Sequence, residues 1–405
     1  MGRKVKVFLA AAALALVAVV GGASASDPGV SSNSILIGGT FPLSGPASAY
    51  GTIASADKAY FDWFNSRSSI HGRKIDFKFY DDGYNPAQTV QLTRQLVEQD
   101  KVFAIFNALG TEPNLAIRDY LNQRKVPQAL IATGASYWGT QWRKYPWTTG
   151  FNPDYVGEAE IYGKFILSKV PQAKVGILMQ NDDYGKDYLR GFKKGLGAKG
   201  AAKIVDTEPY DVTQADVSQQ MVKLKGSGAN VLMVFATPKF SVQSFVIAAK
   251  IGWHPIFFVN NVSATASLMT AATKLSSPEI TNGAISVAYT KDPADPKLAN
   301  DRGIKLYKAI MAQYYPKGNV NDAFNLYGMT VAWTMVKALQ ASGKTPTRAG
   351  LMKALTHLNI KNNPFLLKGV VIKTSPTDRF LIQQGVLTRW QDGGFHNFGP
   401  LYSAK

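Results

Sequence analysis

The stretch from 34 to 82 constrains the fold more than any other part of the sequence. It opens with a short apolar run, Ile35-Leu36-Ile37, which two glycines close. Such a run predicts a buried strand. After a turn-rich segment at 42–51, apolar residues recur from Thr52 onward at the spacing of an amphipathic helix, and alternation over 75–80 predicts a second strand. Strand, helix and strand in this order form a right-handed crossover unit, which requires a parallel sheet.

The alternation of strands and helices continues in two blocks. Further strands are predicted at 102–106 and 128–132, with helices before and between them, and these complete a first lobe. An irregular segment rich in aromatic residues, 142–154, precedes a second alternating block that runs to 287. Three helices and short terminal strands follow. The expected fold class is therefore α/β, with two doubly wound lobes.

The first 25 residues are typical of a signal peptide. Arg3, Lys4 and Lys6 precede an apolar run at 7–20, and Ala23-Ser24-Ala25 provides a cleavage site. No later stretch reaches the ~20 apolar residues that a membrane helix needs. The sequence has no cysteine, so neither a disulfide nor a lipid-modified cysteine is expected. These features predict an exported protein that is free in the periplasm.

The chain of 405 residues is long enough for two or three domains, and 46% hydrophobic residues supply a sizeable core. Its net charge is +18, but Lys and Arg are scattered along the chain. A nucleic-acid-binding protein gathers such residues into patches. We therefore expect a basic, solvated surface and no nucleic-acid partner.

The sequence carries no recognisable catalytic or cofactor motif. Gly195, Gly197 and Gly200 have the spacing of a dinucleotide fingerprint, but they close a predicted helix where a fingerprint must open one. The four histidines lie far apart and give no metal-ligand spacing. We interpret Asp81-Asp82 as a solvated turn rather than an acid–base pair. No cofactor, no metal and no enzymatic activity are expected; an exported hydrolase is the alternative.

Small and hydroxyl-bearing residues gather in the loops after the predicted strands of the first lobe. In open parallel sheets, ligands bind at the carboxyl ends of the strands. Such loops leave main-chain N–H groups exposed above helix N-termini, where they can hold a carboxylate without a cation. The alternative is that these are ordinary turns. The residues concerned are Ser44, Thr111, Thr133, Gly134, Ala135 and Ser136.

Several of these loops resemble the solute-binding proteins of branched-chain amino-acid-type ABC importers, in the type I periplasmic binding protein class. The resemblance covers 34–400 and rests on the order and spacing of its motifs together. It implies two lobes joined by three crossings, with the ligand enclosed between the lobes. The motifs are FPLSGPASAYG at 41–51, GTEPNLA at 110–116, ATGAS at 132–136 and NDDYG at 181–185.

The resemblance also implies the division of the chain and a ligand site. The N-terminal lobe takes 34–149 plus 288–368, and the C-terminal lobe takes 150–287 plus 369–405. The family's site for the ligand carboxylate falls on 134–136. The full set of expected ligand-binding residues is Ser44, Tyr50, Ala108, Leu109, Gly110, Thr111, Gly134, Ala135, Ser136, Tyr184, Lys239 and Asn261.

One departure from the family bears on the ligand. In the amino-acid binders, a carboxylate late in the second lobe meets the ligand's ammonium, because a buried charge needs a partner. Here the corresponding positions, 260–262, hold Asn, Asn and Val, and Lys239 brings a cation where the family often has an aromatic residue. Both changes favour an acid without an amino group, such as an aromatic or branched carboxylic acid. Branched-chain and hydrophobic amino acids are the competing ligands.

The function that these observations predict is that of a periplasmic solute-binding component of an ABC importer. The protein is expected to be a monomer that delivers a small carboxylate with an apolar side to a membrane permease. A ligand sensor of the same fold, which presents the solute to a receptor, is the alternative among binding proteins.

Overall fold

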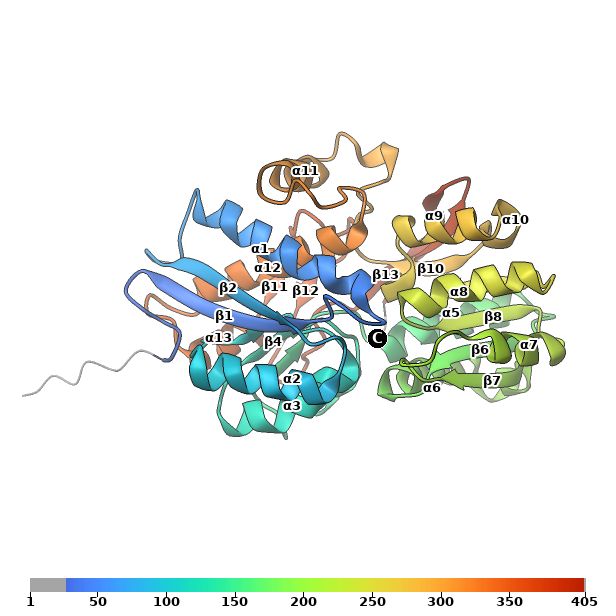
Figure 1. Cartoon of the computed structure of the whole chain (residues 1–405), viewed down its shortest axis with the longest axis horizontal. Helices are drawn as coiled ribbons and strands as arrows, with labels where there is room; N and C mark the ends of the chain where they lie inside the picture. Colours follow the sequence, from blue (N-terminus) through green and yellow to red (C-terminus); the bar gives the residue numbers. More distant parts are fainter. Residues whose placement is uncertain (1–26, 404–405) are drawn as a thin grey trace, which may run out of the picture.

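Two sheets, one parallel and one mostly parallel, form the centres of two lobes that lie side by side in the computed structural model (Figure 1). The structure describes residues 27–403, so the predicted signal peptide lies outside the described residues. Among the described residues, none of the helices has the length and apolar character needed to cross a membrane.

The first sheet has the strand order β2-β1-β3-β4-β5, and every pairing in it is parallel. The order reverses between β1 and β3, which is where open sheets of this type place a ligand. Its strands are β1 (Ser34–Phe41), β2 (Lys74–Asp81), β3 (Ile105–Phe106), β4 (Gln128–Ile131) and β5 (Thr148–Gly150).

The second sheet repeats this order in the segment β7-β6-β8-β9-β10 and adds two antiparallel strands at one edge. Strands β6 and β8 are buried along their whole length, because helices cover both faces of the sheet. The strands are β6 (Val175–Gln180), β7 (Ile204–Tyr210), β8 (Val231–Phe235), β9 (Ile256–Val259), β10 (Ile285–Ala288), β13 (Gln384–Gln391) and β14 (Gly394–Ser403).

Helices cover both faces of the first sheet (Figure 1). The main core of this lobe lies under α1 and α12, and a smaller apolar cluster lies under α2 and α3. A two-stranded sheet, β11 (Asn359–Ile360) and β12 (Ile372–Lys373), adds to the same lobe. The helices are α1 (Thr52–Asn65), α2 (Pro86–Arg94), α3 (Thr111–Gln123), α4 (Tyr137–Thr140), α11 (Arg302–Tyr314), α12 (Ala323–Ala341) and α13 (Arg348–Leu355).

In the second lobe, α5 and α6 cover one face of the sheet, and α7, α8 and α9 cover the other. Near the end of α6, Gly197 has a φ of 60° and bends the helix. The three glycines of the apparent dinucleotide motif therefore lie in the last turns of a helix, as expected. The helices are α5 (Tyr155–Lys169), α6 (Asp183–Gly200), α7 (Ser218–Gly226), α8 (Pro238–Lys250), α9 (Ala266–Leu275) and α10 (Pro278–Thr281).

Strand β1 is longer than the sequence predicted. Gly38 and Gly39 do not end the strand but lie within it, and neighbouring groups approach both positions too closely for a side chain. A Cβ on Gly39 would lie 2.6 Å from the carbonyl oxygen of Phe106. The third strand is shorter than the predicted 102–106, and the short strand β5 and helix α9 were not predicted at all.

The described chain passes between the two lobes three times, as the resemblance implied. It leaves the first sheet after β5, returns after β10 and enters the second sheet again at β13. The last passage differs from the prediction, which placed it at 368/369. Val370, Leu381 and Ile382 pack in the core of the first lobe, and the strand that joins the second sheet begins at Gln384.

Helices α5 and α6 pack closely through glycines, which lets their backbones approach. A Cβ on Gly191 would lie 2.2 Å from the carbonyl oxygen of Val156, and one on Gly195 would lie 2.3 Å from that of Glu160. Real side-chain carbons do not come this near to backbone atoms, so any larger residue must push the two helices apart.

We expect Gly191→Ala to lower the free energy of unfolding by about 1–3 kcal/mol, because overpacking forces a backbone shift. Gly226→Ala is the matched control, since nothing lies within 4 Å of a Cβ at this helical position. The control should be neutral or stabilising by up to about 1 kcal/mol. Urea unfolding measures both variants. Equal stability of the two would contradict the close approach of α5 and α6.

Candidate functional site: an interlobe cavity

A cavity of about 400 Å³ lies between the lobes, where the carboxyl ends of strands from both sheets meet. The hinge segment after β10 closes one side. The first lobe contributes Tyr50, Ile53, Tyr84, Leu109, Gly110, Thr111, Ala132, Phe324 and Tyr327; the second contributes Tyr184, Thr237, Asn261, Val262, Thr265 and Ala266; the hinge contributes Asn152, Tyr155, Tyr289, Lys291 and Asp292.

Aromatic rings form much of the wall. Tyr50 meets Phe324 edge to face with ring centroids 5.0 Å apart, and Tyr155 meets Tyr184 in the same way at 5.3 Å. Burial raises the pKa of Tyr50, Tyr84 and Tyr184 well above the ordinary value. These hydroxyls are therefore neutral at physiological pH, and each combines an apolar ring with a hydrogen-bonding group.

Asp81 and Asp82 hold two of the cavity loops in place. The Asp81 side chain accepts hydrogen bonds from the N–H groups of Leu43 (2.9 Å) and Ser44 (3.1 Å), which ties the first loop to the end of β2. Asp82 is fully buried and accepts from the N–H of Tyr84 at 3.0 Å. The interpretation of this pair as a solvated turn is wrong for Asp82, because its carboxylate lies inside and positions Tyr84.

The N-terminus of α3 points its first turn at the cavity. Gly110 precedes it with a φ of 101°, a conformation that favours glycine, and a Cβ there would lie 2.7 Å from the Tyr84 ring. The Thr111 hydroxyl lies 2.7 Å from that of Thr133. A helix N-terminus with a hydroxyl beside it attracts an anion, because its first N–H groups have no partner within the helix.

The second lobe presents amides to the cavity. The hydroxyl of Tyr184 donates to the buried amide of Asn260, which in turn donates to Val234 and Ala236 of the strand end below. Asn261 is fixed from both sides. Its N–H donates to the Glu158 carboxylate at 2.7 Å, and its side chain donates to the carbonyl of Val287 at 2.6 Å.

Charged groups reach the cavity from the hinge segment after β10. Lys291 is already paired, since its Nζ lies 2.7 Å from Asp301 and 2.8 Å from the carbonyl of Pro364. The Asp292 side chain accepts a hydrogen bond from the backbone N–H of Ala294 at 2.9 Å. Burial raises the pKa of Asp292. An acidic side chain therefore lines the cavity from a segment that sequence reasoning did not consider.

Six of the expected residues meet in this cavity, and they come from the first-lobe loops and the second lobe alike. Tyr184 lies in the first turn of α6, where Asp182 caps the helix by accepting from the N–H of Gly185 at 3.2 Å. The residues that line the cavity are Tyr50, Leu109, Gly110, Thr111, Tyr184 and Asn261.

The segment Gly134-Ala135-Ser136, expected to hold the ligand carboxylate, does not line the cavity. The Tyr155 ring lines the cavity and also covers this segment, since a Cβ on Gly134 would lie 2.7 Å from the ring. The N–H of Ala135 donates to the Thr133 hydroxyl at 3.3 Å, and that of Ser136 donates to Asp187 at 2.7 Å. In this structure these donors are therefore covered and already bonded, and ligand binding by the segment stays a prediction.

Three other expected residues also lie elsewhere. Ser44 is exposed, and its N–H is held by Asp81. Ala108 is buried against α3 in the small cluster on the other face of the sheet. Lys239 lines a shallow groove beside the first loop, and its Nζ donates to the carbonyl of Gln214 at 3.2 Å. Because α8 begins at Pro238, the preceding residue Thr237 faces the cavity in place of Lys239.

Sequence reasoning missed several lining residues for different reasons. Tyr84 lies in the loop after strand β2, so its position near a strand end was a usable signal. Phe324 and Tyr327 lie in the first turns of α12, a helix that returns from the second crossing, and Asn152 lies in the first crossing. Tyr327 donates to Asn152 at 2.7 Å. No local pattern marks these three as neighbours of the loops.

The described residues contain no group of three or more His, Asp or Glu side chains that could hold a metal ion. The cavity offers aromatic rings, hydroxyls, amides and one helix N-terminus, with charged side chains of both signs at the hinge side. Such a lining suits a small molecule that is partly apolar and has a few polar groups.

Residues 34–394 match the family described as periplasmic binding protein. The chain is similar to the Leu/Ile/Val-binding protein homolog 3 of Brucella melitensis, with 27% identity over 54% of this chain and 57% of that protein. It is also similar to the Leu/Ile/Val-binding protein of Escherichia coli strain K12, with 25% identity over 45% of this chain and 49% of that protein. The chain thus matches about half the length of these relatives.

Solved structures share the fold over nearly the whole length. A branched-chain amino acid ABC transporter structure from Thermus thermophilus with bound valine has a TM-score of 0.80 and 16% identity, and covers 92% of this chain and 97% of its own. A fatty acid ABC transporter substrate-binding protein from Thermomonospora curvata has a TM-score of 0.77 and 20% identity, with 93% and 94% covered. At these identities the likeness shows the fold alone.

The buried carboxyl of Glu158 makes a pH-dependent prediction. Burial raises the pKa of Glu158 from 4.5 to about 7, although Asn261, Tyr162 and Tyr188 all donate to it. The folded state therefore binds more protons than the unfolded state between these values. Stability is lost as the pH rises through this window, because the ionised form is buried at a cost.

In Glu158→Gln the side chain is neutral at every pH, so this loss should disappear. We expect the difference in the free energy of unfolding, variant minus parent, to be roughly 2–3 kcal/mol larger at about pH 8 than at about pH 4. Urea unfolding at several pH values measures it. A difference between variant and parent that does not change with pH would contradict the raised pKa.

Proposed function

Because this chain belongs to the periplasmic binding protein family, we propose that it is the solute-binding component of an ABC importer. In this proposal the protein captures a small carboxylate with an apolar side in the interlobe cavity and delivers it to a membrane permease. The periplasm is its site of action.

The observation that carries the proposal is the pairing of an anion-binding end with aromatic walls in one cavity. The first turn of α3 and the Thr111 hydroxyl form the end that suits a carboxylate. Tyr50, Tyr84 and Tyr184 supply neutral rings for the apolar part. Lys291 is engaged by Asp301, so the helix dipole and the hydroxyl, rather than Lys291, hold the anion.

The size of the cavity agrees with this ligand class. Small-molecule sites typically enclose about 300–1,000 Å³, and this cavity has about 400 Å³. The relatives named for Leu, Ile and Val, and the structural neighbour named for fatty acids, have in common a ligand with a carboxylate and an apolar side chain.

A branched-chain or hydrophobic amino acid is the second candidate ligand, and Asp292 favours it. The sequence argument against an amino acid was the lack of an acid at 260–262. The Asp292 carboxylate lines the cavity from the hinge and can meet an ammonium group there. An aromatic acid without an amino group needs no such partner and would leave Asp292 protonated or water-bonded.

Thr111→Val tests the anion-binding end. The valine keeps the shape but removes the hydroxyl, so we expect ligand affinity to fall by about 1–3 kcal/mol, the cost of an unmet charged partner. Ser44→Ala is the matched control, because Ser44 is a loop hydroxyl of the same lobe outside the cavity. Calorimetric titration measures both. Equal affinities of the two variants would move the carboxylate site elsewhere.

Asp292→Asn separates the two ligand classes. A thermal-shift screen of leucine, valine, benzoate and cinnamate identifies the ligand, since a ligand of the native state raises the melting temperature by mass action. If the ligand is an amino acid, Asp292→Asn should abolish its stabilising effect. If it is an aromatic acid, the variant should bind equally well or more tightly. Failure of every carboxylate in the screen would contradict the proposed ligand class.

A further inference from the structure

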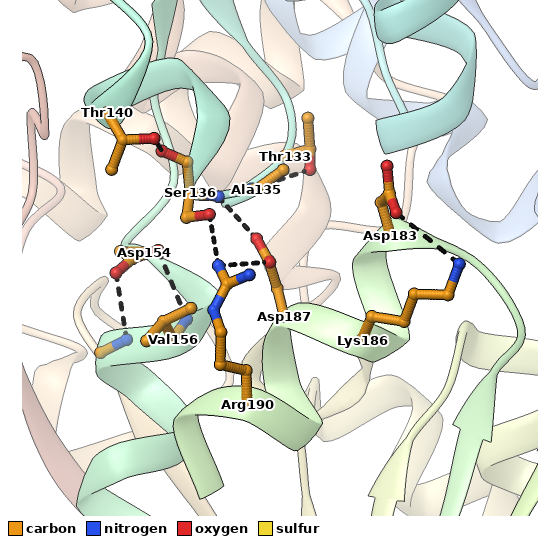
Figure 2. A network of polar contacts seen from close by, with 11 residues as sticks. Thr133, Ala135, Ser136, Thr140, Asp154, Val156, Asp183, Lys186, Asp187 and Arg190 are labelled. Atoms are coloured by element: carbon orange, nitrogen blue, oxygen red, sulfur yellow. Dashed lines mark hydrogen bonds and ion pairs between the residues drawn. The ribbon is translucent and has the colours of Figure 1, made fainter. Parts of the chain in front are cut away.

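The first turns of α6 contact the first lobe at a place apart from the cavity. Figure 2 shows Ser136, at the start of α4, beside Asp187 and Arg190 of α6. The two elements belong to different lobes, so contacts between them exist only while the lobes are together. We call Ser136, Asp187 and Arg190 the interlobe clasp.

The clasp is a closed ring of short polar contacts. One carboxylate oxygen of Asp187 accepts from the main-chain N–H of Ser136 at 2.7 Å, and the other lies 2.7 Å from the Arg190 guanidinium. Arg190 completes the ring by donating to the Ser136 hydroxyl at 2.7 Å. Asp187 is only 1% exposed, so its charge depends on these two partners.

A second carboxylate crosses between the lobes nearby in the opposite direction. Glu112, in the first turn of α3, accepts from the main-chain N–H of Asp183 at 3.0 Å. Asp183 lies at the start of α6, where the helix dipole favours a negative charge. Each lobe therefore places a carboxylate of its own on a main-chain N–H of the other lobe.

These contacts leave no room for an external anion at 134–136. The Ser136 N–H and hydroxyl are both engaged within the clasp, and the Ala135 N–H is bonded to Thr133. A carboxylate that approached from solvent would also meet the charge of Asp187 itself. Small anions bind such a loop only if the internal carboxylate is removed.

We propose that Asp187 acts as an internal anion that holds the two lobes together. Its carboxylate occupies, on the Ser136 N–H, the position that a free carboxylate would otherwise take, and Arg190 fixes it there. Formation of the clasp accompanies closure and is independent of the ligand. A consequence for specificity, which rests on the proposed function, is that the ligand carboxylate is restricted to the α3 end of the cavity.

Replacing Asp187 by alanine should open the ring and create a vacant anion site. The Ser136 N–H, the Ser136 hydroxyl and the Arg190 guanidinium remain in place and match the oxygens of formate. In the ligand-free protein, we expect Asp187→Ala to lower the melting temperature and to raise the radius of gyration measured by small-angle X-ray scattering. Formate should reverse both changes in a saturable way, because it binds the closed state.

Asp183→Ala is the matched control, since it removes the same charge from the same helix but not from the clasp. Formate should leave the control and the parent protein unchanged. An equal effect of formate on all three proteins, or an Asp187→Ala protein with parental dimensions and no response to formate, would overturn the proposal.

Arg190→Gln keeps the test decisive if Asp187→Ala does not fold. Arg190 is half exposed, so its replacement is tolerated, but it removes two of the three contacts in the ring. We expect a partial increase in the radius of gyration that formate does not reverse, because the anion position is still filled by Asp187. An unchanged radius would overturn the proposal. None of these readouts uses the transported solute, so their failure is distinct from failure of the proposed function.

Discussion

At the carboxyl ends of parallel strands, main-chain N–H and C=O groups no longer have hydrogen-bond partners within the sheet. In this protein both sheets direct these ends toward the space between the two lobes. The short loops that follow must satisfy these groups and also fill the space between the lobes. Asp81 and Asp82 do so after β2, and Asn260 does so after β9. The side chains that the two sheets leave to face the gap include several tyrosines and small residues, which gives a partly apolar cavity with its charged groups at the hinge.

In the scheme that we propose, ligand binding and lobe closure use different groups. In the cavity, Lys291 is paired with Asp301, and the anion end is made of helix dipole and hydroxyl. At the interface outside the cavity, the internal carboxylates of Glu112 and Asp187 meet main-chain N–H groups across the lobes. In the scheme that we propose, closure therefore does not compete with the solute for donors.

The fold could be predicted from the sequence because its signals are local. The apolar runs at 231–235 and 256–259 and the helical spacing at 155–169 match the observed elements residue for residue. The site could be predicted only in part. The strand-end loops do bring Tyr50, Thr111 and Tyr184 to the cavity, whereas the position of the Tyr155 ring over Gly134 depends on how the hinge folds back. Asp187 sits within a helix, and Asp292 sits in a crossing. No local pattern reveals what either side chain meets across the gap.

The most direct test of the account is a crystal structure of the protein with the carboxylate that calorimetry shows to bind. The account predicts electron density for the solute between the rings of Tyr50, Tyr84 and Tyr184, with the carboxylate against the first turn of α3 and the Ser136 N–H still bonded to Asp187. Solute density on the 134–136 segment, with Asp187 displaced, would contradict it.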